Sequence, residues 1–287
     1  MKDKLYIIDI SSFIHRSFHA HGDLYTSHGM PSGAIYGTLN LLCKFISENK
    51  PKYIAVCYDA QDGKSVRRDI YPEYKANRVK VNTVSAQEII IRKIIGMLGI
   101  YGITASGYEA DDLIATVTDK FKHELDIVIL TGDKDMLQLV DENVSIFDSM
   151  KNLTYNEKTA FDKFGVKPSQ ISDYLALCGD KADNIPGGEG IGPKAAQDLL
   201  SQYAGVEEIE YRLHSAPPKY RDKLVKSMDK IKLSKRLTDL VRLDVDISLE
   251  DLKVQPKYTK EIDDILDKLE FKNNTKDKLR KAIKLYE

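Results

Sequence analysis

Three apolar segments that each end in an aspartate limit the folds open to this chain. Segments 5–9 (LYIID), 53–59 (YIAVCYD) and 126–133 (DIVILTGD) are rich in Val, Ile and Tyr and are apolar at nearly every position. A strand that is apolar on both faces has to be covered on both faces, which is typical of parallel sheets flanked by helices. The sequence therefore predicts an α/β fold, with a parallel-sheet core and helices on both faces of the sheet.

The segments between and after these strands have the periodicity of helices. Apolar residues recur near 3.6 spacing in segments 33–49, 85–99 and 108–124. From about residue 156 the strand pattern stops, and helical patterns continue to the C-terminus. We therefore expect an α/β core at residues 1–155 and a mostly helical region at residues 156–287.

Acidic residues gather at the ends of the expected strands and at three further motifs. Ligands of open parallel α/β sheets bind in the crevice outside the carboxyl ends of the strands, so acids that end strands should converge there. The candidate acids are Asp9, Asp59, Glu109, Asp111, Asp112, Asp133, Asp135, Asp180 and Asp183. Each motif alone also fits an ordinary helix start or turn, because acids stabilise the first turn of a helix.

Together, the acids predict a metal site. Two unpaired carboxylates near 4 Å apart repel by about 1 to 4 kcal/mol at effective dielectric constants of 80 to 20. A fold that brings so many together needs cations to neutralise them. Carboxylate oxygens without neighbouring His or Cys favour Mg²⁺ or Mn²⁺ over zinc. There are more acids than one octahedral ion needs, which predicts two ions, the arrangement used in phosphodiester hydrolysis.

A glycine-rich segment, 187–196 (GGEGIGPKAA), predicts a phosphate contact of another kind. It is not a P-loop, because Pro193 stands where a Lys must follow the last Gly. It also matches the GxGxxA pattern of dinucleotide-binding folds, but no strand precedes it, as such a fold requires. Pro193 suits the first position of a helix, and the preceding backbone amides with Lys194 could hold one DNA phosphate, as in a helix-hairpin-helix turn. A tight turn between packed helices is the alternative.

Charge is balanced overall but segregated along the chain. Lys and Arg number 43 against 44 Asp and Glu, a net charge of −1 that by itself argues for no polyanionic partner. Segment 64–80, however, carries a local charge of +4, and segment 219–236 carries +6. These basic segments predict surfaces for an anionic partner.

Cysteine usage and hydropathy exclude several other classes of protein. Cys43, Cys57 and Cys178 have no CxxC spacing, so neither a disulfide framework nor a zinc cluster is indicated. No apolar run approaches the roughly 18 residues of a membrane span. We expect a cytoplasmic protein in a reducing compartment, with no membrane partner.

The motifs taken together resemble the bacterial and phage 5′ nuclease family. In order and at matching spacing, the chain contains LYIIDISSFIHRSFHA, PSGAIYGTLN, CYDA, EYKANR, YEADDLIAT, LTGDKDMLQLV and LALCGDKADNIPGGEGIGPKAAQDLL. That family includes the N-terminal domain of DNA polymerase I, free-standing 5′-3′ exonucleases and flap endonucleases. The resemblance covers essentially the whole chain. It implies a PIN-like or resolvase-like core, a helical arch at about 64–90 and a helix-hairpin-helix (helix-three-turn-helix) element at about 182–200.

The resemblance also implies roles for individual residues. Lys75 and Arg78 match arch residues that reach the scissile phosphate, and Arg16 matches another basic residue of the active site. The first metal site would use Asp59, Glu109, Asp111 and Asp112, with Asp9 acting through water, and the second would use Asp133, Asp135, Asp180 and Asp183. The DNA-binding residues would be Tyr74, stacked on a nucleobase, and Gly187, Gly190, Gly192 and Lys194. A K⁺ ion held by backbone carbonyls is expected at the helix-hairpin-helix.

The sequence thus predicts a structure-selective 5′-3′ exonuclease and flap endonuclease. Its substrates would be 5′ flaps and 5′ ends of duplex DNA, with RNA–DNA primer junctions as further substrates, and its roles RNA-primer removal and repair. We expect a monomer. A free-standing enzyme and a domain of a longer polymerase both fit. Two alternatives stay open: a non-catalytic protein that binds DNA structures, and an RNase of the PIN type.

Overall fold

A six-stranded sheet forms the centre of the first half of the chain in the computed structural model, which describes residues 2–78 and 82–286. The strand order is β3-β2-β1-β4-β5-β6. The strands are β1 (Lys4–Asp9), β2 (Tyr53–Cys57), β3 (Tyr101–Ile103), β4 (Asp126–Leu130), β5 (Val144–Asp148) and β6 (Leu153–Tyr155). All neighbours are parallel except the antiparallel pair β5 and β6. The three predicted strands are confirmed, and β3, β5 and β6 are additional.

The registers bring the ends of the central strands to one edge. β1 lies between β2 and β4, with Asp9 opposite Cys57 and Ile8 opposite Leu130. Consecutive residues of β1 point to opposite faces, so Ile7 lies in one apolar cluster and Ile8 in another. Both faces of the sheet are therefore buried, as the continuous apolar runs predict.

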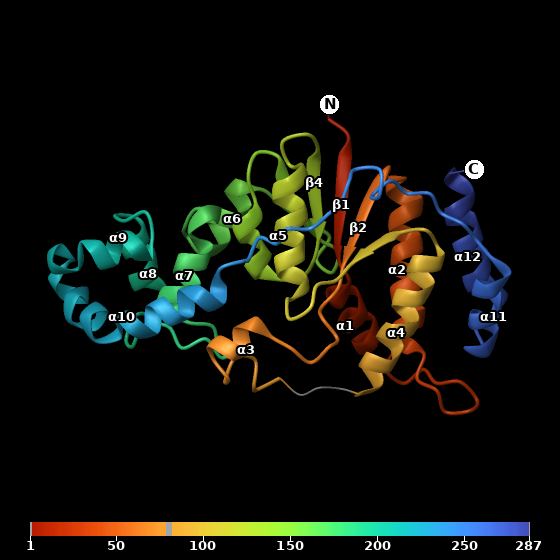
Figure 1. The fold of residues 1–287 in the computed structure, drawn as a ribbon, viewed down its shortest axis with the longest axis horizontal. Helices are drawn as coiled ribbons and strands as arrows, with labels where there is room; N and C mark the ends of the chain where they lie inside the picture. The colour runs from red at the N-terminus through yellow and green to blue at the C-terminus, as the bar shows by residue number, and fades with distance from the viewer. Residues whose placement is uncertain (1, 79–81, 287) are drawn as a thin grey trace.

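Helices cover each face of the sheet (Figure 1). One face packs against α1 (Ile10–His21), α2 (Gly33–Asn49) and α4 (Asn82–Met97), and the other against α5 (Ala110–Phe121). Of the predicted arch at about 64–90, the structure describes α3 (Val66–Ile70), the turns to residue 78 and the start of α4, while residues 79–81 lie outside the described residues.

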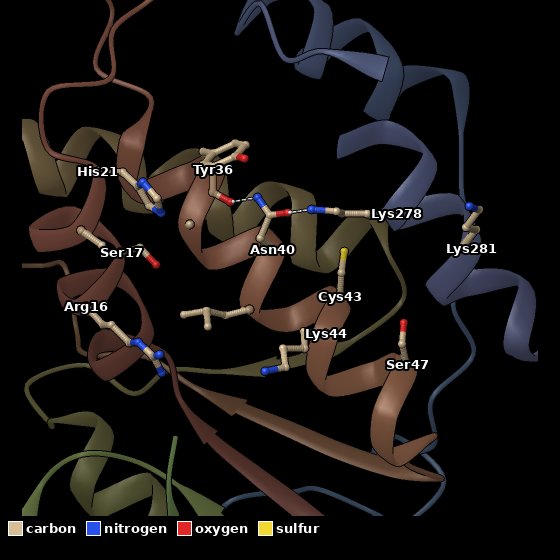
Figure 2. Close-up of a pocket in the computed structure, with 13 residues that line it drawn as sticks. Arg16, Ser17, His21, Tyr36, Asn40, Cys43, Lys44, Ser47, Lys278 and Lys281 are labelled. Carbon is tan, nitrogen blue, oxygen red and sulfur yellow. Dashed lines mark hydrogen bonds between the residues drawn. The ribbon is translucent and has the colours of Figure 1, made fainter. Parts of the chain in front are cut away.

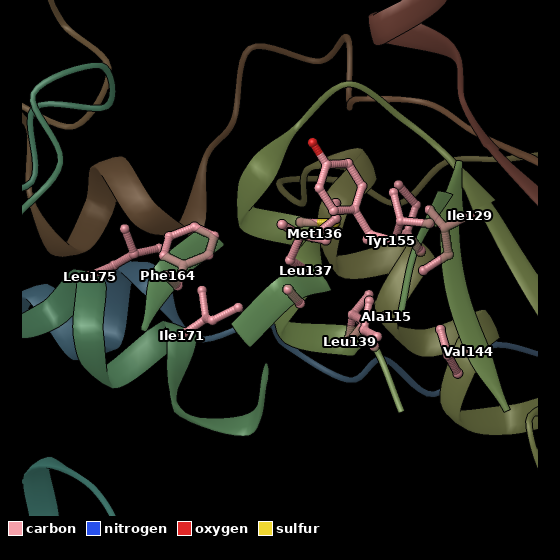
Figure 3. Close-up of a cluster of buried hydrophobic side chains, with 14 of the residues drawn as sticks. Ala115, Ile129, Met136, Leu137, Leu139, Val144, Tyr155, Phe164, Ile171 and Leu175 are labelled. Atoms are coloured by element: carbon pink, nitrogen blue, oxygen red, sulfur yellow. The ribbon is translucent and has the colours of Figure 1, made fainter. Parts of the chain in front are cut away.

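The second half of the chain begins as a helical lobe. It contains α6 (Glu157–Phe164), α7 (Ile171–Cys178), α8 (Pro193–Leu200), α9 (Val206–Tyr211) and α10 (Pro218–Thr238). Figure 3 shows the apolar cluster that joins β4, β5 and the 3₁₀ segment Lys134–Leu139 to α6 and α7. The lobe and the sheet therefore share one core.

After α10 the chain returns to the α/β core and crosses α5 on its way (Figure 1). The Ile54 amide on β2 donates to the carbonyl of Leu252 at 2.8 Å. Helices α11 (Lys260–Lys268) and α12 (Asn273–Ile283) then bury Leu266 and Leu279 in the cluster that contains α2. Residues from about 240 to 286 thus pack on the first half of the chain, although the sequence grouped them with the helical region, because helical periodicity does not say which surface a helix will cover.

Within the described residues, no helix is long and apolar enough to cross a membrane.

Candidate metal and nucleic-acid site

Two strand-ending acids are fixed at the carboxyl edge of the sheet. The carboxylate of Asp9 accepts a hydrogen bond from the Ser12 amide at 3.2 Å and caps α1, and it accepts another from the Thr131 hydroxyl at 2.6 Å. Asp59, two residues after β2, accepts from the Ser11 hydroxyl at 2.8 Å and from the Ala110 amide at 2.9 Å. These bonds tie β1, β2 and α5 together at one point.

Helix starts position four more acids. Glu109 caps α5, and Asp111 lies in its first turn. Asp133 caps the 3₁₀ segment after β4 by accepting from the Asp135 amide at 2.8 Å. Local capping geometry therefore places these carboxylates, as the acid-rich helix starts in the sequence indicate.

Burial and mutual repulsion join the acids into one electrostatic cluster. Burial, together with the neighbouring charges of Asp59 and Asp133, raises the pKa of Asp9 to about 6, although hydrogen bonds from Thr131 and Ser12 lower it. Burial, with the charge of Asp133 next, raises the pKa of Asp135 to about 7. The pKa of Asp111 is raised well above its usual value, chiefly by burial and also by Asp133. The acids are therefore close enough to raise one another's pKa.

Asp180 and Asp183 approach the cluster from the loop after α7. Both add to the field that raises the pKa of Asp135. The Asp180 carboxylate lies 3.1 Å from the ammonium of Lys134. Asp183 pairs with Arg78, and its carbonyl accepts from the Lys75 amide at 2.9 Å. The helical lobe thus contributes two of the four acids that the family resemblance assigns to a second metal, Asp180 and Asp183.

Lys75 lies between acids from two different parts of the chain. Its ammonium is 2.8 Å from Glu109 and 3.6 Å from Asp183, and its side chain is 14% exposed. Although burial favours a neutral amine, Glu109 and other nearby acids hold the pKa of Lys75 well above its usual value. Lys75 and Arg78 therefore both lie beside the acids, each in an ion pair with at least one of them.

The donor set fits hard divalent cations. The cluster offers carboxylate oxygens in desolvated surroundings, and Oδ1 of Asp135 is buried without a hydrogen-bond partner. Protein cations stand among the acids, and within the described residues no three potential ligands already converge on one point. A divalent ion would therefore need these side chains to rearrange.

Asp112 differs from the other predicted ligands. It is fully buried and forms a two-pronged ion pair with Arg67, in which both N–O distances are 2.7 Å. The structure does not place its oxygens toward the other acids as free ligands.

Arg16 is bonded to a residue outside the acid cluster. Its guanidinium donates to the Ser149 hydroxyl at 2.8 Å. It lines a cavity of about 630 Å³. Figure 2 shows the residues of α1, α2 and α12 around this cavity, among them Lys44 and Lys278. The described structure contains no ion pair between Arg16 and the cluster.

Tyr74 does not have the exposed ring that stacking on a nucleobase requires. The residue is 3% exposed and packs with Ile185 and Leu237, and its hydroxyl donates to Glu109 at 3.0 Å. In this conformation the expectation is wrong, because the tyrosine's apolar body is more stable in the small core between the arch segment and the lobe.

The glycine-rich turn divides into a structural part and an open part. Gly187 is buried with a φ of 64°, its amide donates to Ser234 at 2.9 Å, and a Cβ there would lie 2.3 Å from the Gly179 nitrogen. The expected phosphate contact by Gly187 is therefore wrong, since its amide is already bonded inside the protein. Gly192, by contrast, caps α8 with open space around it, and Lys194 is exposed.

Helix α10 adds cations beside the open part of the turn. Lys223 donates to the Gly190 carbonyl at 3.1 Å. Lys226 and Lys230 are exposed at helical spacing from Lys223, which places the three on one face. Leu224, Met228 and Ile231 bury the opposite side of the helix. The +6 segment is thus an amphipathic helix with a basic face next to Gly192 and Lys194.

Three residues at the site were not expected from the sequence: Thr131, Lys134 and Arg67. Thr131 directly precedes the GDKD motif and Lys134 lies within it, so their sequence position was an available signal. The pairing of Arg67 with Asp112, 45 residues apart, had no such signal.

Comparison with known proteins places these features in one family. Residues 4–165 match the 5′-3′ exonuclease N-terminal resolvase-like domain, and residues 166–260 match the 5′-3′ exonuclease C-terminal SAM fold. A 5′-3′ exonuclease of Aquifex aeolicus is 40% identical over 279 residues, which cover 95% of this chain and 94% of that protein. DNA polymerase I of Caldicellulosiruptor bescii is 41% identical over 279 residues, but this chain spans only 33% of its length.

Solved structures share the fold. T5 5′-exonuclease with bound zinc ions aligns over 99% of this chain and 100% of that chain, with a TM-score of 0.68 and 22% identity. The T5 D15 flap endonuclease in complex with DNA and metal ions aligns over 97% of this chain and 99% of that chain, with a TM-score of 0.65 and 24% identity. The matched domains, the near full-length relative and the acid-lined sheet edge lead to one conclusion: this chain belongs to the 5′-3′ exonuclease family.

Proposed function

We propose that this protein is a structure-selective 5′ nuclease that hydrolyses phosphodiester bonds at 5′ flaps and 5′ ends of duplex DNA with two divalent metal ions. The observation that carries the proposal is the cluster of buried, mutually repelling carboxylates beside Lys75 and Arg78. Such an arrangement is costly unless cations neutralise it, and it is the donor set that Mg²⁺ or Mn²⁺ prefers. The T5 relatives solved with metal ions and with DNA agree with this proposal.

The proposed ligands come from two groups of elements. Asp9, Asp59, Glu109 and Asp111 lie around the ends of β1 and β2 and the start of α5. Asp133, Asp135, Asp180 and Asp183 lie after β4 and α7. When bound, the two ions would activate water and stabilise the attacking and leaving oxygens. We leave Asp112 out of this set because Arg67 occupies it.

Lys75 and Arg78 would act on the substrate once they leave their acid partners. Both are on the segment that follows α3, at the mouth of the cluster, and both pair with Asp183. A phosphodiester beside the acids would attract these cations, and they would stabilise the charge that develops on its oxygens. Arg16 would contribute only if its hydrogen bond to Ser149 were exchanged for a contact with substrate.

The open part of the glycine-rich turn and the basic face of α10 would hold the duplex. Gly190, Gly192 and Lys194 would contact one phosphate, and Lys223, Lys226 and Lys230 would extend that contact along the backbone. We therefore propose that residues 1–155 form the nuclease core and that the helical lobe binds DNA.

We further propose that a K⁺ ion binds the backbone carbonyls of the glycine-rich turn. The protein would act as a monomer in the cytoplasm. Its substrates would be DNA and RNA–DNA primer junctions during replication and repair.

Single-turnover cleavage of an end-labelled 5′-flap DNA tests the proposal. We expect Mg²⁺-dependent cleavage near the junction, and its loss in Asp135→Asn. Asp148→Asn is the matched control, because Asp148 is likewise a buried carboxylate, at the end of β5, but it is bonded to Lys151 at 2.8 Å and is not a proposed ligand. Binding without cleavage in Mg²⁺ or Mn²⁺ would favour the non-catalytic alternative, and faster cleavage of an RNA flap than of a DNA flap would favour the RNase.

A further inference from the structure

Four protein donors fill the carboxylate of Asp112. Oδ1 accepts from Nη2 of Arg67 at 2.7 Å and from the Val241 amide at 2.8 Å. Oδ2 accepts from Nη1 of Arg67 at 2.7 Å and from the Glu109 amide at 3.3 Å. An ionised carboxylate offers about four lone-pair positions, so Asp112 keeps none for another ligand.

Arg67 is equally engaged. Its Nε donates to the Leu237 carbonyl at 2.9 Å, and Nη2 also donates to the Asp239 carbonyl at 3.0 Å. Its Nη1 lies 3.7 Å from Glu109. Both Arg67 and Asp112 are buried, where a fork-shaped pair is stronger and more directional than on the surface.

The pair connects three elements that perform different parts of the proposed reaction. Arg67 is on α3, next to the segment that carries Lys75, and Asp112 is in the first turn of α5 beside Glu109 and Asp111. Leu237 lies in the last turn of the basic helix α10, and Asp239 caps that helix. One guanidinium therefore bonds both the acidic start of α5 and the end of the helix that would hold DNA.

We propose that Arg67 and Asp112 are a positioning pair that fixes the acid-bearing turn of α5 against the end of α10, and that Asp112 is not a metal ligand. This inference rests on the proposed function. The carbonyls at the C-terminal end of α10 suit a cation, and a guanidinium satisfies them while it orients α5. The duplex surface and the acid cluster are thereby held at one fixed separation.

Metal binding without DNA separates a positioning residue from a ligand. We would measure Mn²⁺ binding by calorimetry in the wild type, Asp112→Asn, Arg67→Lys and Asp135→Asn, the last of which removes a proposed ligand. We expect Asp135→Asn to lose a site or at least tenfold in affinity, whereas Asp112→Asn and Arg67→Lys keep the number of sites and stay within threefold of the wild-type affinity. If Asp112 is a ligand, Asp112→Asn must instead behave like Asp135→Asn.

Flap cleavage at saturating metal provides the second readout. We expect Asp112→Asn and Arg67→Lys each to slow single-turnover cleavage at least tenfold, with no recovery at higher Mg²⁺. The double variant should be no slower than the slower single variant, because each change breaks the same ion pair. Recovery of Asp112→Asn at high Mg²⁺, or additive losses in the double variant, would overturn the inference. Should Asp112→Asn fail to fold, Arg67→Lys carries both measurements. A wild-type protein that neither binds Mn²⁺ nor cleaves would instead refute the proposed function.

Discussion

Replacing Lys75 with Met tests whether this ammonium neutralises the acid cluster until substrate arrives. Its Nζ lies 2.8 Å from Glu109 and 3.6 Å from Asp183, and its side chain is 14% exposed. Removing one partner of a buried ion pair costs about 3 to 5 kcal/mol. Tyr74 and Arg67 still face Glu109, and Arg78 still pairs with Asp183. We therefore expect the low end, a loss of about 3 kcal/mol in the free energy of unfolding in EDTA.

The same change should strengthen the response to divalent cations. With Lys75 gone, two carboxylates lose a competing cation, so excess Ca²⁺ or Mg²⁺ should stabilise Lys75→Met more than the wild type. A tenfold gain in affinity corresponds to about 1.4 kcal/mol of extra stabilisation. Single-turnover flap cleavage should fall at least about 100-fold, or about 2.7 kcal/mol, while duplex affinity changes little.

Urea unfolding with EDTA and with excess Ca²⁺ measures both stability effects. Lys134→Met is the matched control: its ammonium lies 3.1 Å from Asp180 but its side chain is 46% exposed, so we expect a loss of about 1 kcal/mol or less. Equal stability of Lys75→Met and the wild type in EDTA, with equal responses to metal, would refute the reasoning. Equal losses in cleavage rate and duplex affinity would make Lys75 an ordinary phosphate contact.

Four further outcomes follow from the structure. Cleavage should require Mg²⁺ or Mn²⁺ and fail with EDTA or with Ca²⁺ alone, and activity that survives EDTA would contradict the metal site. Asp183→Asn should keep or modestly strengthen flap binding in Ca²⁺, because it releases Lys75 and Arg78, while cleavage in Mg²⁺ collapses. Lys194→Ala should weaken flap binding while cleavage at saturating enzyme stays nearly intact, and it should reduce the slope of log affinity against log salt by roughly 1. An unchanged slope would mean that the turn only connects helices. Gly187→Ala should lower the urea-unfolding free energy by about 2 kcal/mol or more, because the new Cβ meets backbone at a positive φ, whereas Gly192→Ala should be nearly neutral for stability.

Much of the site is local in the sequence and could be predicted from it. The runs that end at Asp9 and near Asp59 and Asp133 are strands because they are apolar on both faces, and parallel strands align their carboxyl ends. Glu109 begins a helix because acids there stabilise its first turn. The helix at 33–49 and the start of α8 at Pro193 follow equally from periodicity and from proline's preference for the first helical position. The sheet core, and the placement of acids at its carboxyl edge, could therefore be inferred from local sequence patterns alone.

Contacts between distant segments could not be inferred from local patterns, because they depend on the complete fold. Tyr74 turns inward because Ile185 and Leu237, far along the chain, complete an apolar pocket around it. Gly187 is needed because its backbone lies very close to that of Gly179. A glycine-rich motif does not show whether a given glycine allows such close packing or offers an open amide to a phosphate. No local pattern predicts that the last 45 or so residues return to the α/β core, or that Arg67 pairs with Asp112. Periodicity shows that one face of a helix is apolar, but it does not show which surface that face will cover. The partner of a buried charge likewise depends on where the whole chain brings distant segments together.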